Sequence, residues 1–188
     1  IHDRVLADRK KHCDRDFEAV IDLVKGLEDK GVAINELACG GTPTFPIHAL
    51  HKSRTLCPGT PLLWDAGYAS AFPDLDYLPA AVLAGRVISK PLQHICLDLG
   101  HKSVASEMPH PRMKFLNLEV SSVDNHSEEH LVVGSENSET ISPGDLVYAL
   151  PIHICPTIAL HEQVYVVEDR KLSATWKVVA RNRIVQRM

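Results

Sequence analysis

The stretch Leu146-Val147-Tyr148-Ala149-Leu150-Pro151-Ile152-His153-Ile154-Cys155-Pro156-Thr157 joins an apolar run to a histidine and a cysteine. Residues 146–150 have the pattern of a β-strand. If the strand continues to Cys155, its period of two places His153 and Cys155 on the same face. Pro156 lacks a backbone donor and is expected to end the strand.

This pair has two interpretations. An imidazole beside a thiolate can bind a borderline-soft divalent cation, and zinc is the usual one. Two protein ligands leave positions open for water or substrate, as metal-assisted catalysis requires. The alternative is that His153 and Cys155 are two ordinary core residues. The sequence alone does not decide between these two interpretations.

The strand at residues 146–150 is one of several short strands that the sequence predicts after residue 91. They lie at residues 95–99, 113–120, 130–133, 146–150, 163–167 and 172–179. Clusters of Pro, Gly, Ser and Asp separate them. Short strands with regular turn signals predict an antiparallel β domain, which we place at residues 91–188.

The first half of the chain alternates helix and strand. Apolar residues recur at helical spacing over residues 14–30, with Asp14 or Asp16 as the N-terminal cap and Gly31 at the C-terminal end. Expected strands follow at residues 32–38, 61–64 and 80–89. This alternation favours a parallel α/β arrangement over residues 1–90. The patch at residues 9–11 is expected to be a solvated basic face.

Composition narrows the class of protein. The chain has 188 residues, of which 45% are hydrophobic and 23% charged, and its net charge is -4. These values fit a folded domain and give no basic block for nucleic acid. No apolar run approaches the roughly 18 residues of a membrane span, and the N-terminus lacks the pattern of a signal peptide. Five scattered cysteines favour reduced thiols in a cytoplasmic compartment.

Two turns could receive a phosphate group. Residues 40–44, Gly-Gly-Thr-Pro-Thr, follow an expected strand, and their glycines allow close approach of the backbone to an anion. Residues 58–60, Pro-Gly-Thr, could present amides to the same anion; ordinary turns are the alternative for both. Asp65 and Tyr68 could line a site at a strand end, or Asp65 could simply cap a helix.

Six motifs in this order carry a family resemblance: residues 40–44, 58–60, 65–68, 98–102, 127–130 and 151–157. Together they resemble the D-threonine aldolase and eukaryotic-type D-serine dehydratase family. Its members are pyridoxal-phosphate enzymes of the alanine-racemase fold. The resemblance implies α/β plus β: the second half of a TIM-like barrel at residues 1–90, then a C-terminal antiparallel β domain at residues 91–188.

The resemblance also implies which residues form the site. The cofactor phosphate would be held by four residues, with a tyrosine close by: Gly41, Thr42, Gly59, Thr60 and Tyr68. His153 and Cys155 match the family's divalent-metal ligands, with zinc favoured and manganese or magnesium as alternatives. His153 is also the candidate base that takes the substrate hydroxyl proton.

The implied function is that of a lyase for D-3-hydroxy amino acids. D-threonine aldolase-like cleavage to glycine and an aldehyde is preferred; D-serine dehydratase-like conversion to pyruvate and ammonia is the alternative. In this family the lysine that forms the Schiff base lies early in the barrel, before the part that this chain matches. A third hypothesis is therefore a non-catalytic fragment that binds cofactor or metal. We expect a cytoplasmic homodimer in the full-length form, with a small amino acid substrate and neither nucleic acid nor membrane as partner.

Overall fold

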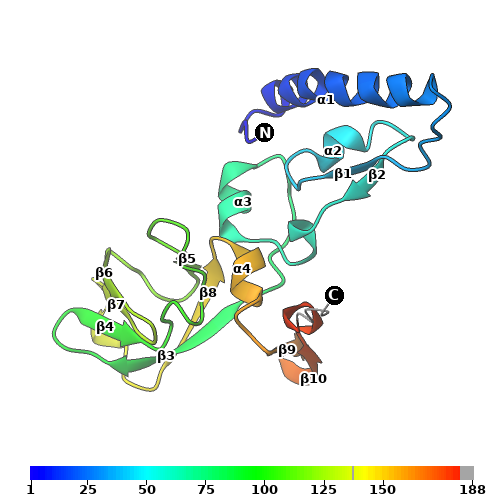
Figure 1. Ribbon diagram of the computed structural model, residues 1–188. Coiled ribbons are helices and arrows are strands. Elements are labelled where there is room, and N and C mark those ends of the chain that lie inside the picture. Colours follow the sequence, from blue (N-terminus) through cyan, green and yellow to red (C-terminus); the bar gives the residue numbers. More distant parts are fainter. Residues whose placement is uncertain (137, 183–188) are drawn as a thin grey trace. The chain divides into compact units, whose positions relative to one another are not determined.

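The computed structural model describes residues 1–136 and 138–182, and the chain divides into two compact units (Figure 1). The first unit comprises Ile1–Trp64 and Ala69–Leu78. The second comprises Asp65–Tyr68 and the chain from Pro79 onward. No helix within the described residues is both long enough and apolar enough to span a lipid bilayer.

Helix α1 (Leu6–Glu28) is the longest element of the first unit and begins earlier than the sequence predicted. Neither Asp14 nor Asp16 caps it; Val5 occupies the N-cap position without a side-chain hydrogen bond. Lys10 and Asp14 form an ion pair at i, i+4 spacing, which favours helix through this charged segment. Gly31 has the expected positive φ, 77°, beyond the C-terminal end.

The basic patch at residues 9–11 is not wholly a solvated face, because Arg9 is fully buried. Its Nη2 pairs with Asp74, and its Nε donates to the carbonyl of Pro43 at 2.9 Å. The guanidinium also lies 4.9 Å from the centre of the Phe72 ring. An arginine is tolerated inside a protein when its charge and donors are satisfied in this way, and Arg9 therefore fastens α1 to the rest of its unit.

Two short parallel strands follow α1: β1 (Ala38–Gly40) and β2 (Thr55–Cys57). Helix α2 (Phe45–His48) lies between them in sequence. The strand predicted at residues 61–64 is wrong, since a 3-10 helix, η1 (Thr60–Leu62), occupies this segment. Pro61 cannot donate to a strand ladder but suits the first position of a helix. Helix α3 (Ala66–Ala71) comes next.

Most of the second unit is a six-stranded antiparallel sheet in the order β5-β8-β3-β4-β7-β6 (Figure 1). The strands are β3 (Leu83–Ser89), β4 (His94–Leu97), β5 (Met113–Phe115), β6 (Ser122–His126), β7 (Leu131–Gly134) and β8 (Leu146–Pro151). A core of Val87, Ile95, Leu97, Val133 and Val147 packs on this sheet. The predicted C-terminal antiparallel β domain is confirmed.

Shorter elements complete the second unit. Strands β9 (Gln163–Glu168) and β10 (Lys171–Lys177) form a separate antiparallel hairpin. Helix α4 (Ile154–Ile158) follows β8, and the 3-10 helices η2 (Ser138–Thr140) and η3 (Val179–Arg181) lie in the connections. Strand β6 was missed in the sequence because it is polar, and it is held by pairing with β7.

The prediction that residues 80–89 belong to the barrel half is wrong, because β3 is part of the antiparallel sheet. It pairs antiparallel with β8, where Leu83 lies opposite Ala149, and antiparallel with β4. A strand covered on one face alternates in burial, as Gly85 and Val87 do, whereas a strand inside a parallel barrel is apolar throughout. Besides Asp65–Tyr68, the second unit accordingly comprises the chain from Pro79, not from near residue 90.

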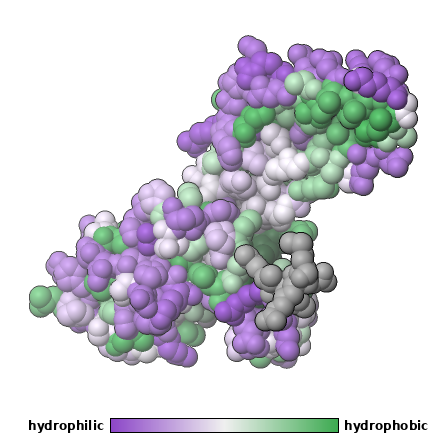
Figure 2. Space-filling view, viewed as in Figure 1, coloured by the Kyte–Doolittle hydropathy of each residue, from purple (hydrophilic) through white to green (hydrophobic). Residues whose placement is uncertain are grey.

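The partial TIM-like barrel stays a prediction, because β1 and β2 are the only parallel pair among the described strands. Figure 2 shows apolar side chains gathered on the surface of the first unit. Large apolar residues that are exposed there include Leu23, Val32, Leu50 and Leu62. Uncovered apolar surface of this kind is what a partial barrel is expected to leave.

Candidate functional site

His153 and Cys155 lie where β8 gives way to α4. Strand β8 ends at Pro151, and His153 is the N-cap of α4, with extended backbone (φ -135°, ψ 105°). Cys155 lies in the first turn of that helix. The predicted strand through Cys155 is therefore wrong, and Pro156 does not end a strand but sits in the first helical turn. Proline is tolerated there because the first amides of a helix have no intrahelical acceptor.

The carboxylate of Asp65 fixes the start of α4. One oxygen, Oδ1, accepts from the N–H of Tyr68 at 2.8 Å, and Oδ2 accepts from the N–H of Ile154 at 3.1 Å. Asp65 is only 1% exposed. It thus caps α3 and α4 together, so the capping interpretation of Asp65 holds and both of its oxygens are already engaged.

The glycine of the same motif has a packing role. A Cβ at Gly67 would lie 2.3 Å from the carbonyl oxygen of Ile152. Only glycine therefore lets α3 approach the segment that carries His153. The Asp-Ala-Gly-Tyr motif and the Ile-His-Ile-Cys motif are consequently one structural assembly within the second unit.

The His153 side chain is held by a residue that the sequence did not point to. Its Nδ1 lies 2.6 Å from Oε1 of Glu107. With Nδ1 donating to this carboxylate, Nε2 carries the lone pair and is the nitrogen that could bind a metal or accept a proton. No motif surrounds Glu107, which lies 46 residues earlier in a loop, so only the fold reveals it.

The same loop is fastened to α4 through the backbone. Thr157 Oγ1 donates to the carbonyl of His153 at 2.7 Å and accepts from the N–H of Ala105 at 3.2 Å. His161 Nε2 lies 2.9 Å from the carbonyl of Ser103. Thr157 is 1% exposed, so its side chain is shielded from water, and these bonds together keep the loop of Glu107 beside His153.

Tyr68 and Cys155 lie near each other in the second unit. The pKa of the Tyr68 phenol is raised above its usual range, mainly by burial and then by the negative charges of Asp65 and Cys155. Cys155 is exposed, and all five cysteines of the chain lie within the described residues without forming a disulfide. Tyr68 is therefore associated with the candidate metal ligand.

The donor types at this site suit zinc. An imidazole Nε2 and a thiolate are both ligands that zinc prefers, and Glu107 supplies the outer carboxylate that commonly orients a ligating histidine. Within residues 1–136 and 138–182, no three side chains of His, Cys, Asp or Glu converge into a metal cage. The predicted site thus has two protein ligands at most from the described chain, and water or substrate would complete it.

The two phosphate-type turns meet in the first unit. Gly40 of β1 lies opposite Cys57 of parallel β2, so the turns that begin at Gly41 and Pro58 leave the same edge of the sheet. The carboxyl ends of parallel strands are the usual place for ligands. Gly41 has φ 93°, and a Cβ at Gly40 or Gly59 would meet nothing within 4 Å, so the backbone is open to approach there.

The hydroxyl residues of these turns, Thr42 and Thr60, are buried. Helix α2 has only four residues, and its contribution to anion binding through a helix dipole is therefore small. Gly41, Thr42, Gly59 and Thr60 all belong to the first unit, and their common role in holding a phosphate stays a prediction. These residues fit a phosphate by backbone access and hydroxyl chemistry.

A second cysteine and histidine pair has a structural role. Cys13 Sγ lies 3.7 Å from His48 Nε2, and Arg54 Nη1 lies 2.9 Å from His48 Nδ1. Burial raises the pKa of the Cys13 thiol and lowers the pKa of His48. Both groups are consequently neutral near pH 7, which argues against a thiolate nucleophile in the first unit.

The two remaining motifs pack against each other. The N–H groups of Gly100, His101 and Lys102 donate to the carbonyls of Glu129, Ser127 and Glu128, at 3.1, 2.9 and 3.0 Å. A Cβ at Gly100 would lie 2.2 Å from the carbonyl oxygen of Glu128. Lys102 also pairs with the carboxylates of Glu128 and Glu129. These motifs therefore join two loops of the second unit.

Comparison with known proteins agrees with the resemblance. Residues 80–167 match the family model described as a putative serine dehydratase domain. The chain is 26% identical over 186 residues to a D-threonine aldolase from Arthrobacter sp., covering 96% of this chain and 48% of that protein. The resemblance to the D-threonine aldolase and D-serine dehydratase family is confirmed for its C-terminal half.

Solved structures share the fold. The D-threonine aldolase from Filomicrobium marinum superposes with a TM-score of 0.80 at 22% identity, covering 96% of this chain and 50% of that one. An alanine racemase-like protein from Idiomarina loihiensis gives a TM-score of 0.72 at 18% identity, covering 93% and 52%. The chain thus spans about half the length of the relatives it matches.

Proposed function

We propose that this chain is the C-terminal half of a pyridoxal-phosphate- and metal-dependent lyase that cleaves D-3-hydroxy amino acids, most closely a D-threonine aldolase-like enzyme. The observation that carries the proposal is the pairing of His153 Nδ1 with Glu107 Oε1 at 2.6 Å, because His153 lies two residues before Cys155. That arrangement presents a basic Nε2 and a thiol on one rigid segment. The 26% identity to the D-threonine aldolase from Arthrobacter sp. supports the choice of the aldolase reaction.

Each group in the proposal has a defined task. Pyridoxal phosphate, when bound, supplies an electron sink, and a divalent metal supplies Lewis acidity toward the substrate hydroxyl. Gly41, Thr42, Gly59 and Thr60 would hold the cofactor phosphate. His153 Nε2 and the Cys155 sulfur would hold the metal.

Proton transfer at the hydroxyl is the step in which His153 would act. If Nε2 is not bound to metal, it can accept the hydroxyl proton, and Glu107 then stabilises the imidazolium that results. If Nε2 binds the metal, Glu107 raises its basicity as a ligand and fixes its orientation. Tyr68, on the Cys155 side, would line the site as a neutral phenol, since its pKa is raised.

A D-serine dehydratase-like reaction is the second candidate. Residues 80–167 match a model described as a putative serine dehydratase domain, and this range contains both His153 and Cys155. The same residues could serve either reaction, because both require a polarised hydroxyl on Cβ. The two differ in which bond breaks, carbon–carbon or carbon–oxygen.

The test is a comparison of products from the full-length polypeptide with added cofactor and zinc. D-threonine should give glycine and acetaldehyde, measured with alcohol dehydrogenase; pyruvate from D-serine, measured with lactate dehydrogenase, would favour the dehydratase. His153→Ala and Cys155→Ala should abolish the activity and lower the zinc content. If activity and zinc content were unchanged in both variants, the proposed site would be refuted. If the complete protein formed neither product, that result would support the interpretation as a non-catalytic protein.

A further inference from the structure

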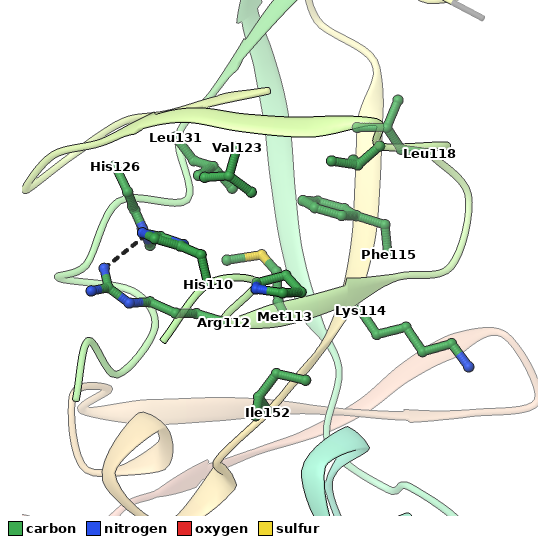
Figure 3. Close-up of a pocket in the computed structure, with 12 residues that line it drawn as sticks. His110, Arg112, Met113, Lys114, Phe115, Leu118, Val123, His126, Leu131 and Ile152 are labelled. Carbon is green, nitrogen blue, oxygen red and sulfur yellow. Dashed lines mark hydrogen bonds between the residues drawn. The ribbon is translucent and has the colours of Figure 1, made fainter. Parts of the chain in front are cut away.

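The second unit contains a pocket whose lining includes Ile152, the residue before His153, but neither His153 nor Cys155. It has a volume of about 290 Å³ and is bordered by β5, β6 and β7 and by the loop before β5. Figure 3 shows a polar end, with Arg112 and His126, and an apolar end, with Phe115 and Leu118. Pockets that are mostly apolar with a few convergent polar groups are the usual form of small-molecule sites.

The polar end is held by three hydrogen bonds. Arg112 Nε donates to the carbonyl of Met108 at 3.0 Å, and Arg112 Nη1 lies 3.1 Å from His126 Nδ1. His126 Nε2 lies 3.0 Å from the carbonyl of Leu99. Because a guanidinium can only donate, Nδ1 accepts and the His126 proton is on Nε2. His126 is therefore a neutral imidazole with both nitrogens engaged.

The charge at this end is not balanced by the protein. Arg112 is half-buried, and its partners, Met108 and His126, are neutral. Within the described residues, no carboxylate forms an ion pair with Arg112. His110, whose ring centre lies 5.3 Å from that of His126, is also held neutral, since burial and then Arg112 lower its pKa. The pocket thus presents the charge of Arg112 without a counter-ion, and the exposed Lys114 adds a second positive charge to its lining.

A partly desolvated guanidinium without an anion is costly, and the cost falls when a carboxylate binds it. Arg112 has donors left at Nη2 after the bonds to Met108 and His126. Met113 and Leu131 are buried beside the pocket, and with Phe115 and Leu118 they offer an apolar wall of several side chains. A ligand that fits has a carboxylate at one end and an apolar body at the other.

We infer that this pocket binds a small amphiphilic carboxylate, with Arg112 on the carboxylate and the Phe115 end on the apolar body. The inference is independent of the proposed function, since it uses neither the metal ligands nor the phosphate turns. It would hold equally if the chain had no lyase activity.

The experiment compares two probes of equal size on the purified chain by isothermal titration calorimetry. Hexanoate carries the charge, and hexanamide is its neutral counterpart. We expect hexanoate to bind about tenfold or more tightly than hexanamide, because only the anion neutralises Arg112. Arg112→Gln should remove that preference while leaving hexanamide binding unchanged.

Two further variants make the result decisive. Arg86→Gln is the matched control, because Arg86 lies in the same unit, is exposed and donates to the carbonyl of Gly144 at 3.0 Å, outside the pocket; it should keep the preference. Val123→Phe should fill part of the pocket beside Leu131 and weaken the binding of both probes, even if Arg112→Gln does not fold. Equal affinity for the two probes, an unchanged preference in Arg112→Gln, or no binding to the wild-type chain would overturn the inference.

Discussion

The carboxylate of Asp65 accepts a hydrogen bond from the backbone N–H of Ile154, 89 residues further along the chain, at a distance of 3.1 Å. The other carboxylate oxygen accepts from Tyr68. One buried side chain therefore starts two helices, α3 and α4, and fixes the segment on which His153 and Cys155 are presented. Stability and the candidate site are coupled at this residue.

Replacing Asp65 should destabilise the second unit. We expect Asp65→Ala to lower the free energy of unfolding by about 2–3 kcal/mol, since each lost cap costs about 1 kcal/mol and buried N–H groups lose their acceptor. Asp65→Asn keeps one acceptor oxygen and should have roughly half the effect. Urea unfolding followed by circular dichroism measures both. Asp145→Ala is the control, because Asp145 accepts a single exposed N–H bond, from Ser142; an equal loss in all three variants would contradict the double cap.

The close approach at Gly67 gives a second prediction. Gly67→Ala should cost about 1–3 kcal/mol, because the new methyl group would collide with the rigid carbonyl of Ile152. Gly26→Ala is a matched control in the interior of α1, where a Cβ meets nothing within 4 Å, and it should stabilise by about 0.5–1 kcal/mol. Thermal unfolding of both variants should therefore shift in opposite directions; a shift of the same sign in both would count against the packing argument.

Periodicity predicted much of the second unit. Alternation and turn clusters located β4, β7, β8, β9 and β10 to within a few residues, since a strand with one covered face shows its period in the sequence. Strand β6 was missed because its stability comes from pairing with β7, not from its own side chains. The placement of β3 was wrong because an apolar strand does not reveal whether its neighbours run parallel or antiparallel.

The site was only partly predictable for a similar reason. The sequence predicted two turns that could receive one anion, but it missed β2, the strand before the second turn. The structure places both turns at the same edge of a parallel pair. The geometry of His153 and Cys155 depends instead on Asp65, and the pairing of His153 depends on Glu107. Both are contacts between distant segments, and no local pattern encodes them.

Protonation of His126 should make the second unit less stable in mild acid. Its pKa is lowered from the usual 6.5, mainly by burial and also by Arg112, while the hydrogen bond to the carbonyl of Leu99 acts in the opposite sense. Below pH 6.5 the unfolded chain therefore binds more protons than the folded chain, so stability is present above that pH and is lost as the pH falls. Urea midpoints at pH 7.5 and 5.5 measure the loss. His126→Gln should reduce the difference, and an undiminished difference would exclude His126 as its source.

The pairing of Glu107 with His153 predicts an effect on metal affinity. We expect Glu107→Ala to weaken zinc binding by roughly 10- to 100-fold, because His153 loses both its fixed orientation and the charge that raises its basicity as a ligand. Glu107→Gln keeps an acceptor oxygen without the charge, and its loss should be smaller. A competition titration against a zinc-binding dye at pH 7.5 measures these affinities.

Matched variants separate this effect from a general change in surface charge. Glu119→Gln removes one exposed carboxylate from the same unit and should leave zinc affinity unchanged. His153→Ala and Cys155→Ala remove the proposed ligands and should weaken binding more than any change at Glu107. If Glu107→Ala binds zinc as tightly as Glu119→Gln does, while the two ligand variants lose it, then His153 binds the metal without help from Glu107. The short contact between them would then serve only to hold the loop.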